Sequence, residues 1–319
     1  MNSWKVFSAQ EKIIRFEVTG GTTDRGAVVR AKDSTVAVTG TGTGHHGIFV
    51  SGMVDADFDN TLVGGTDQIG MLVLDTESAG TLRFRNGSVF AAFPYNNQAS
   101  ASHSLTLVFD NAEWRWGGGD KTFSYVSNGL GDGVYRSNRY IKTEGTGMIL
   151  KPDDGCTFRT EVPFGGTGGL VAAGEGTVAF AGDTLRFTGL LDIRSGTVDL
   201  SGASPLDALR VRGPGTLKGG TVGILTIDGT VPGGDSPDAP VLSGVSADTV
   251  VVDFGADGSD PVCVENLLVA TWPAENPPSV RRWKATGTGH ERAHVRFASA
   301  GGEVRVTVKE DLGLVITVR

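Results

Sequence analysis

The chain has 319 residues, of which 48 are glycine, and it carries a formal net charge of −8 at pH 7. This acidic balance argues against the basic stripes by which proteins recognise nucleic acid or an anionic membrane surface. No window of the sequence approaches the ~20 apolar residues of a membrane-spanning helix. We therefore expect neither a nucleic-acid partner nor a membrane span.

Residues 1–20 contain several large apolar side chains but no apolar segment of the signal-peptide kind. We expect them to cap the N-terminal end of the fold, and we expect the sequence to be a fragment of a longer chain. Beyond them, apolar and polar residues alternate in runs of four or five that Gly, Asp, Asn or Ser bound, as in short β-strands. The predicted strands are 35–38, 47–50, 71–74, 81–84, 105–109, 148–150, 185–187, 190–193, 224–227 and 249–252. Helical patterns are nearly absent, so the sequence predicts an all-β fold.

Asp55, Asp57 and Asp59 alternate within one predicted strand, in a segment that resembles the start of a calcium loop. Such a loop needs Gly at its sixth position and Glu at its twelfth, where this chain has Asn60 and Thr66. A solvated acidic strand face is the alternative interpretation. We expect no cofactor, and the three aspartates are the one calcium candidate.

The alternation weakens between residues 94 and 144, where we expect loops to project from the fold at 94–98, 117–120 and 125–140. Trp114 and Trp116 occupy alternate positions of a strand in this region, so they share one face. Exposed indoles stack on sugar rings, which makes the pair the candidate carbohydrate-binding site. Burial beneath the loop at 125–140 is the alternative interpretation.

One short motif, Gly-Thr followed by an alternating run, begins at Gly176, Gly196 and Gly215. A fixed spacing near twenty residues is typical of a solenoid in which each repeat is one coil. Three strands of about five residues with tight bends use roughly 20 residues, so the coils are predicted to be β-coils. The apolar second and fourth positions after the glycine, such as Val178 and Phe180, are expected to point into the coil.

Four aspartates and four arginines fall at outward positions of these coils. They are Asp183, Asp192, Asp199, Asp207, Arg186, Arg194, Arg210 and Arg212. A glycosidase needs two carboxyl groups about 5–10 Å apart, and a lyase needs calcium-binding aspartates beside a basic residue. Polar side chains on the outside of any solenoid look the same, so both interpretations stay open.

Around residue 255 the sequence pattern changes: prolines become frequent, and longer alternating runs follow. We expect an antiparallel β-meander of three strands, at 294–297, 303–308 and 314–318, with Val304, Val306 and Val308 on one face. The predicted organisation is a β-helix with an N-terminal cap over residues 1–255 and a C-terminal antiparallel β cap over residues 256–319.

The segment from His290 to His294 has the letters of the H-E-x-x-H zinc motif. That chemistry requires a helix, and on a strand residues i and i+4 lie about 13 Å apart and cannot share one zinc ion. The strand pattern after His294 therefore predicts no zinc site. Cys156 and Cys263 are in no metal-ligand spacing, and we expect them to be buried small apolar residues.

The segments Gly165–Leu170, Gly176–Gly182 and Ser195–Gly202 resemble the autotransporter-associated β-strand repeat. The resemblance covers residues 165–225 and implies a right-handed parallel β-helix that is secreted or displayed on a cell surface. It implies an adhesive or scaffolding role and supplies no catalytic residues.

We therefore expect a non-enzymatic structural or adhesive module of a secreted or cell-surface bacterial protein. Its expected partners are a surface polysaccharide or further copies of the chain. The alternatives are a carbohydrate-active enzyme, either a polysaccharide lyase or a glycosidase, and a self-assembling filament subunit.

Overall fold

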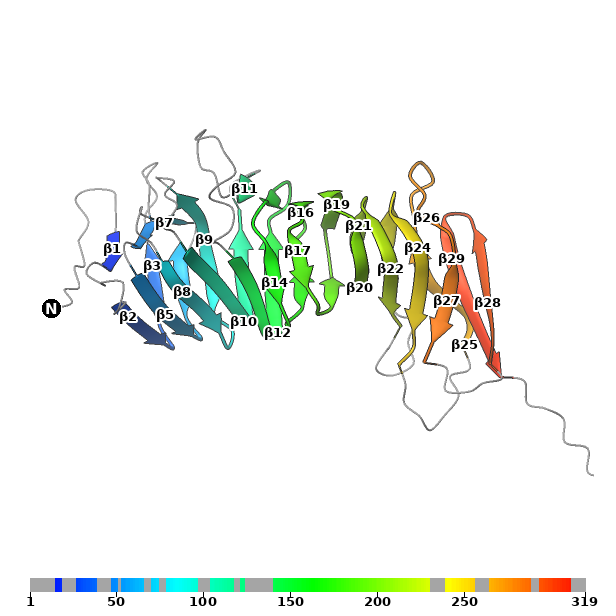
Figure 1. The fold of residues 1–319 in the computed structure, drawn as a ribbon, viewed down its shortest axis with the longest axis horizontal. Coiled ribbons are helices and arrows are strands. Elements are labelled where there is room, and N and C mark those ends of the chain that lie inside the picture. Colours follow the sequence, from blue (N-terminus) through cyan, green and yellow to red (C-terminus); the bar gives the residue numbers. More distant parts are fainter. Residues whose placement is uncertain are drawn as a thin grey trace, which may run out of the picture. The chain divides into compact units, whose positions relative to one another are not determined.

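The computed structural model describes residues 15–18, 27–38, 47–50, 53–65, 70–74, 79–96, 104–117, 121–123, 140–229, 239–255, 264–287 and 293–310. Every regular element in these ranges is a β-strand (Figure 1). No helix long and apolar enough to cross a membrane occurs in them. The chain divides into two compact units: unit 1 contains residues 1–190 and 196–204, and unit 2 contains residues 191–195 and 205–319.

Unit 1 is a stack of parallel β-coils. Its strands are β1 (Arg15–Val18), β2 (Ala27–Lys32), β3 (Thr35–Val38), β4 (Gly47–Val50), β5 (Met53–Asp59), β6 (Leu62–Gly65), β7 (Gly70–Leu74), β8 (Ala79–Arg85), β9 (Val89–Asn96), β10 (Ser104–Trp116), β11 (Lys121–Phe123), β12 (Tyr140–Pro152), β13 (Thr157–Thr160), β14 (Phe164–Gly166), β15 (Leu170–Ala172), β16 (Thr177–Gly182), β17 (Leu185–Phe187) and β19 (Thr197–Ala203). One face pairs β2, β5, β8, β10, β12, β14 and β17 in succession, all parallel. A second face pairs β11, β13, β16 and β19, also parallel.

The twenty-residue spacing is confirmed on this second face. Thr157, Thr177 and Thr197 lie in register on β13, β16 and β19. Val178 and Phe180 are each 1% exposed, so the predicted inward positions are also confirmed. Inward side chains of successive coils stack on one another in the same way as the backbone strands do.

The strands of unit 1 differ from the sequence prediction in two places. Residues 94–96 are the end of β9, where Pro94 and Tyr95 pair with β7, and not the start of a loop. β1 pairs in parallel with β4, so residues 15–18 belong to the coils and not to a separate cap. The rest of the expected N-terminal cap, and residues 97–103, 118–120 and 124–139, lie outside the described residues.

Unit 2 is also built from parallel β-coils. Its strands are β18 (Leu191–Ile193), β20 (Leu206–Arg212), β21 (Thr216–Lys218), β22 (Thr221–Asp228), β23 (Val241–Ser243), β24 (Ser246–Asp253), β25 (Val264–Thr271), β26 (Ser279–Val280), β27 (Trp283–Thr286), β28 (Ala293–Ala300) and β29 (Glu303–Glu310). β18, β20, β22 and β24 pair in parallel, and β24 pairs in parallel with both β26 and β27. The parallel coils therefore run past the boundary predicted at residue 255, as far as Thr286. The proline-rich segment does not end them, because it lies between strands of the last coil.

The end of unit 2 is antiparallel, as predicted. β29 pairs antiparallel with β25 on one side and with β28 on the other (Figure 1). Val304, Val306 and Val308 are at most 1% exposed, so they form the buried face that the alternation predicted. The strand on the other side of β29 is β25. Residues 314–318, the third strand of the predicted meander, lie outside the described residues. The fold is thus all-β, a parallel β-helix that ends in antiparallel strands.

Candidate functional surfaces

The two tryptophans proposed as a sugar-binding surface belong to the core of unit 1. Trp114 is 0% exposed and Trp116 is 1% exposed. Trp114 stacks on Phe109 with ring centroids 5.4 Å apart, and Trp116 meets Phe158 edge to face at 4.5 Å. The structure therefore corrects the carbohydrate-binding interpretation, because neither ring has a face open to a ligand. The alternative, burial, is what the structure has.

The three aspartates of the calcium candidate lie on the outer face of β5, where alternate residues point to solvent. Arg85 on the next coil has its Nε 2.9 Å from Asp57 Oδ1 and an NH2 nitrogen 3.5 Å from Asp59 Oδ2. In the part of the chain that the structure describes, no three His, Cys, Asp or Glu side chains converge to hold a metal ion. Asp55, Asp57 and Asp59 therefore do not converge on one metal position, and Asp57 and Asp59 pair with Arg85 instead.

A corner of unit 1 carries a ladder of polar residues that the sequence prediction missed. Asp33, Asn60, Asn86 and Asn111 have φ between 48° and 54°, the left-handed region that Asn and Asp tolerate best among residues other than glycine. The side-chain amide of Asn60 donates to Asp33 Oδ1 at 2.9 Å, and that of Asn86 donates to Asp59 Oδ1 at 2.9 Å. We call these four residues the asparagine corner.

Buried hydroxyl groups follow the asparagine corner on its inner side. Ser88 is 0% exposed, and its Oγ lies 2.8 Å from the carbonyl oxygen of Phe58 and 2.7 Å from that of Arg85. The same Oγ accepts a hydrogen bond from the backbone N–H of Thr61 at 3.0 Å. The sequence signal for this arrangement is an Asn shortly before a Ser or Thr, at residues 60–61 and 86–88.

Glu113 on β10 is a carboxylate of unit 1 whose pKa is shifted by its surroundings. Its Oε1 lies 2.6 Å from Arg115 Nε and its Oε2 lies 2.7 Å from Lys151 Nζ, with only 13% of the Glu113 side chain exposed. Burial is the largest single influence and raises the pKa of Glu113. The hydrogen bonds and charges of Lys151 and Arg115 together outweigh it and lower the pKa below its ordinary value of 4.5.

Two of the carboxylates considered for glycoside cleavage have a partner nearby in the chain. Asp183 pairs with Arg186 at 2.6 Å, and Asp199 accepts a hydrogen bond from the backbone of Ser201 at 2.8 Å, both in unit 1. In unit 2, Asp207 is exposed.

Asp192, by contrast, is buried within unit 2 and faces two arginines. Its Oδ2 accepts hydrogen bonds from Arg194 Nε at 3.1 Å and from an NH2 group of Arg212 at 2.9 Å. Asp192 and Arg212 are also in register on neighbouring strands. These contacts join one coil to the next.

The remaining motifs fall at the edges of the described chain. His294 is exposed on strand β28, whereas His290 to Arg292 and Cys263 lie outside the described residues. The strand predicted after His294 is confirmed, and Cys156 is buried as expected, at 8% exposed. Comparisons of the chain with protein-family models, with curated proteins and with solved structures found no match.

Proposed function

We propose that this chain is a non-enzymatic structural or adhesive module of a secreted or cell-surface repeat protein. The observation that supports the proposal is that charged side chains on the outside of the coils form ion pairs with side chains of other coils. The repeated Gly-Thr motif supports assignment to a surface protein, through its resemblance to the autotransporter-associated repeat.

Two ion pairs reach past the neighbouring coil. Arg83 on β8 pairs with Glu144 on β12, although β10 lies between these strands. Arg210 on β20 pairs with Asp253 on β24 at 2.8 Å, and it also lies 3.3 Å from Asp228 on the intervening β22. Each such bond spans three strands and resists their separation.

The energy of one of these pairs is small. The side chains of Arg83, Glu144 and Arg210 are all more than a third exposed, so each pair contributes at most about 1 kcal/mol. Their value to a solenoid is cumulative, because each coil contacts only its neighbours and stability is a sum of interfaces. Coils that resist separation suit a spacer or an adhesive stalk.

A polysaccharide panel separates this function from the carbohydrate-active alternative. The full chain is incubated with neutral and acidic polysaccharides, with and without calcium, and both new reducing ends and unsaturated products are measured. We expect no turnover, and co-sedimentation with insoluble polysaccharides distinguishes an adhesive from a purely structural module. Turnover that Asp192→Asn abolishes while the melting temperature stays unchanged would establish the enzyme instead.

A further inference from the structure

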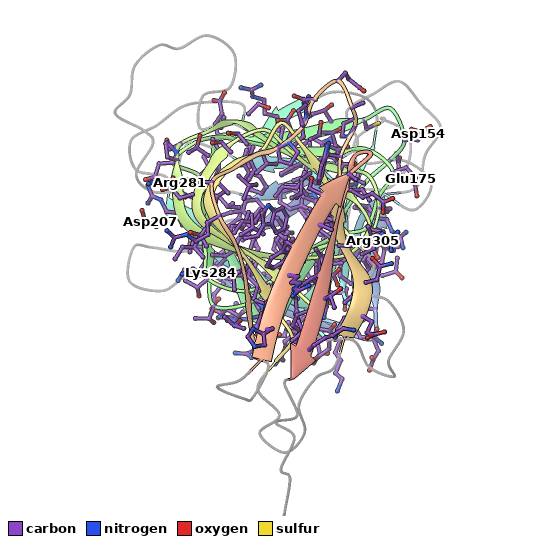
Figure 2. All side chains as sticks on the ribbon, turned by 90° about the vertical axis from the view of Figure 1, so that its right-hand side faces the viewer. Asp154, Glu175, Asp207, Arg281, Lys284 and Arg305 are labelled. Carbon is purple, nitrogen blue, oxygen red and sulfur yellow. The ribbon has the colours of Figure 1, made fainter. Side chains whose placement is uncertain are left out.

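β28 is the last strand of the antiparallel sheet in unit 2. It pairs with β29 along its full length, from Ala293 opposite Glu310 to Ala300 opposite Glu303. Its other edge has no strand partner among the described residues. Figure 2 looks onto this end of unit 2, where the hairpin of β28 and β29 lies beside β25 and Arg305 is labelled. An edge of this length presents free N–H and C=O groups and is a template for a further strand.

The two faces of β28 differ in character. On the outer face, His294, Arg296, Ala298 and Ala300 are all exposed. On the inner face, Val295 and Phe297 are only partly covered, and Phe297 meets Trp283 of the last parallel coil with ring centroids 5.8 Å apart. A strand added at this edge would cover apolar surface at the end of the coil.

The order of residues along β28 is self-complementary about Phe297. In an antiparallel pair of two identical strands related by a two-fold axis, opposed residues share a face. With the axis at Phe297, Arg296 faces Ala298, Val295 faces Ser299, and His294 faces Ala300. Each long side chain then lies opposite a small one, and the two phenyl rings of Phe297 meet at the axis.

Other positions of the axis are less favourable. An axis at Val295 shortens the ladder, because it sets Ala298 opposite residue 292, before β28 begins. An axis at Arg296 sets this arginine against its own copy. Like charges directly opposite each other destabilise a strand pair. An axis at Ala298 places His294 opposite Gly302, beyond the end of β28, and shortens the ladder. Charge and length therefore both select Phe297.

We propose that β28 pairs with β28 of a second copy of this chain, antiparallel and centred on Phe297, so that one sheet continues through both copies. The contact is isologous and closes after two copies, and it therefore makes a dimer and not a filament. The backbone ladder provides the attraction, and the alternation of large and small side chains fixes the register.

The test compares opposite charges at Ala298 in the full-length chain. Ala298→Lys sets a lysine against Arg296 of the other copy, whereas Ala298→Glu creates two symmetric ion pairs. We expect the wild-type chain to dimerise in sedimentation velocity, the lysine variant to weaken the dimer about tenfold, and the glutamate variant to strengthen it. Ala208→Lys, at an exposed alanine of β20, is the matched control that should leave the dimer unchanged.

Melting temperatures separate folding from association, because Ala298 also lies opposite Arg305 within the chain. Register is tested by Phe297→Cys, which should form a symmetric cross-link under oxidation, while Ala300→Cys should not. A wild-type chain that stays monomeric at high concentration would refute the proposal. A dimer whose affinity is the same in the wild-type chain, Ala298→Lys and Ala298→Glu would refute it too. Dimerisation only after residues 311–319 are deleted would show that this segment, and not a second copy, occupies the edge.

Discussion

The side chain of Asn60 donates a hydrogen bond to the carboxylate of Asp33 at 2.9 Å, across a sequence separation of 27 residues. Both residues have a positive φ, 48° for Asn60 and 49° for Asp33. The same pair of residues thus turns the chain at a corner and joins one coil to the next. The residues of the asparagine corner take the place of the glycines that would otherwise be needed at these bends.

Substitutions at Asn60 should separate these two contributions. Asn60→Ala loses the hydrogen bond and places an alanine at positive φ, which costs about 1–2 kcal/mol in backbone strain alone. Asn60→Gly loses the same hydrogen bond without the strain, so we expect it to be the milder change. Urea unfolding of the two variants measures the difference. Equal destabilisation would show that the left-handed backbone contributes nothing to this corner.

Two glycines of unit 1 form a second matched pair. Gly147 has φ +95°, and a Cβ there would lie 2.1 Å from the carbonyl oxygen of Gly169. Gly155 has φ +68°, and a Cβ added to it would meet nothing within 4 Å. Gly155→Ala should therefore cost only the strain of about 1–2 kcal/mol. Gly147→Ala should cost clearly more, because backbone atoms of the next coil have to move.

Thermal unfolding of the two alanine variants checks this expectation. The comparison tests the coil spacing itself, since the clash at Gly147 exists only if Gly169 lies directly on the neighbouring coil. Similar melting temperatures for the two variants would contradict the close stacking at Gly147.

The coil period and its inward positions could be predicted from the sequence because the repeat is short and regular. Val178 and Phe180 recur as Val198 and Leu200, and all four are buried. The same reasoning could not place Trp114. Strand alternation assigns Trp114 and Trp116 to one face, but it does not say which face is inside. The residues opposite Trp114 on the neighbouring coils would show which face is inside. They cannot be identified from the sequence because the coils of this region are unequal in length: Leu107 pairs with Ile141, and Ile141 pairs with Phe164.

The C-terminal sheet was predictable only in part for a similar reason. The hairpin of β28 and β29 has a short link and clear alternation. β25 was missed because its pairing with β29 shifts register twice and because Asn266 has φ 55°, which breaks the alternation of the strand. Irregular strands of this kind carry little signal in sequence.

Truncation of Trp114 measures how much the aromatic core contributes to unit 1. Trp114 contacts Phe90, Phe109, Trp116 and Phe158, with ring centroids between 5.2 and 6.1 Å apart. Trp114→Ala should lower the free energy of unfolding by about 3–5 kcal/mol, and Trp114→Phe by less. Denaturant unfolding checks the order. Loss of polysaccharide binding in Trp114→Phe, without loss of stability, would restore the carbohydrate-binding interpretation.

The lowered pKa of Glu113 predicts a pH dependence of stability with a definite sign. A carboxyl group whose pKa is lower in the folded state stabilises the fold above its unfolded pKa, near 4.5, and loses that contribution as pH falls through the folded value. We expect the wild-type chain to be more stable than Glu113→Gln at neutral pH. The difference should shrink steadily once the pH falls below about 4.5.

Chemical denaturation of the wild-type chain and of Glu113→Gln from neutral to acidic pH measures this difference. The control is Glu265→Gln, because Lys309 also lowers the pKa of Glu265 but Glu265 is fully exposed. Solvent and salt screen an exposed pair, so the control should show a weaker pH dependence that added salt removes. Glu113 is held by Arg115 and Lys151 with little of its side chain exposed, and its pH dependence should persist in salt. A difference between the wild-type chain and Glu113→Gln that grows towards acid pH would contradict the assigned direction of the shift.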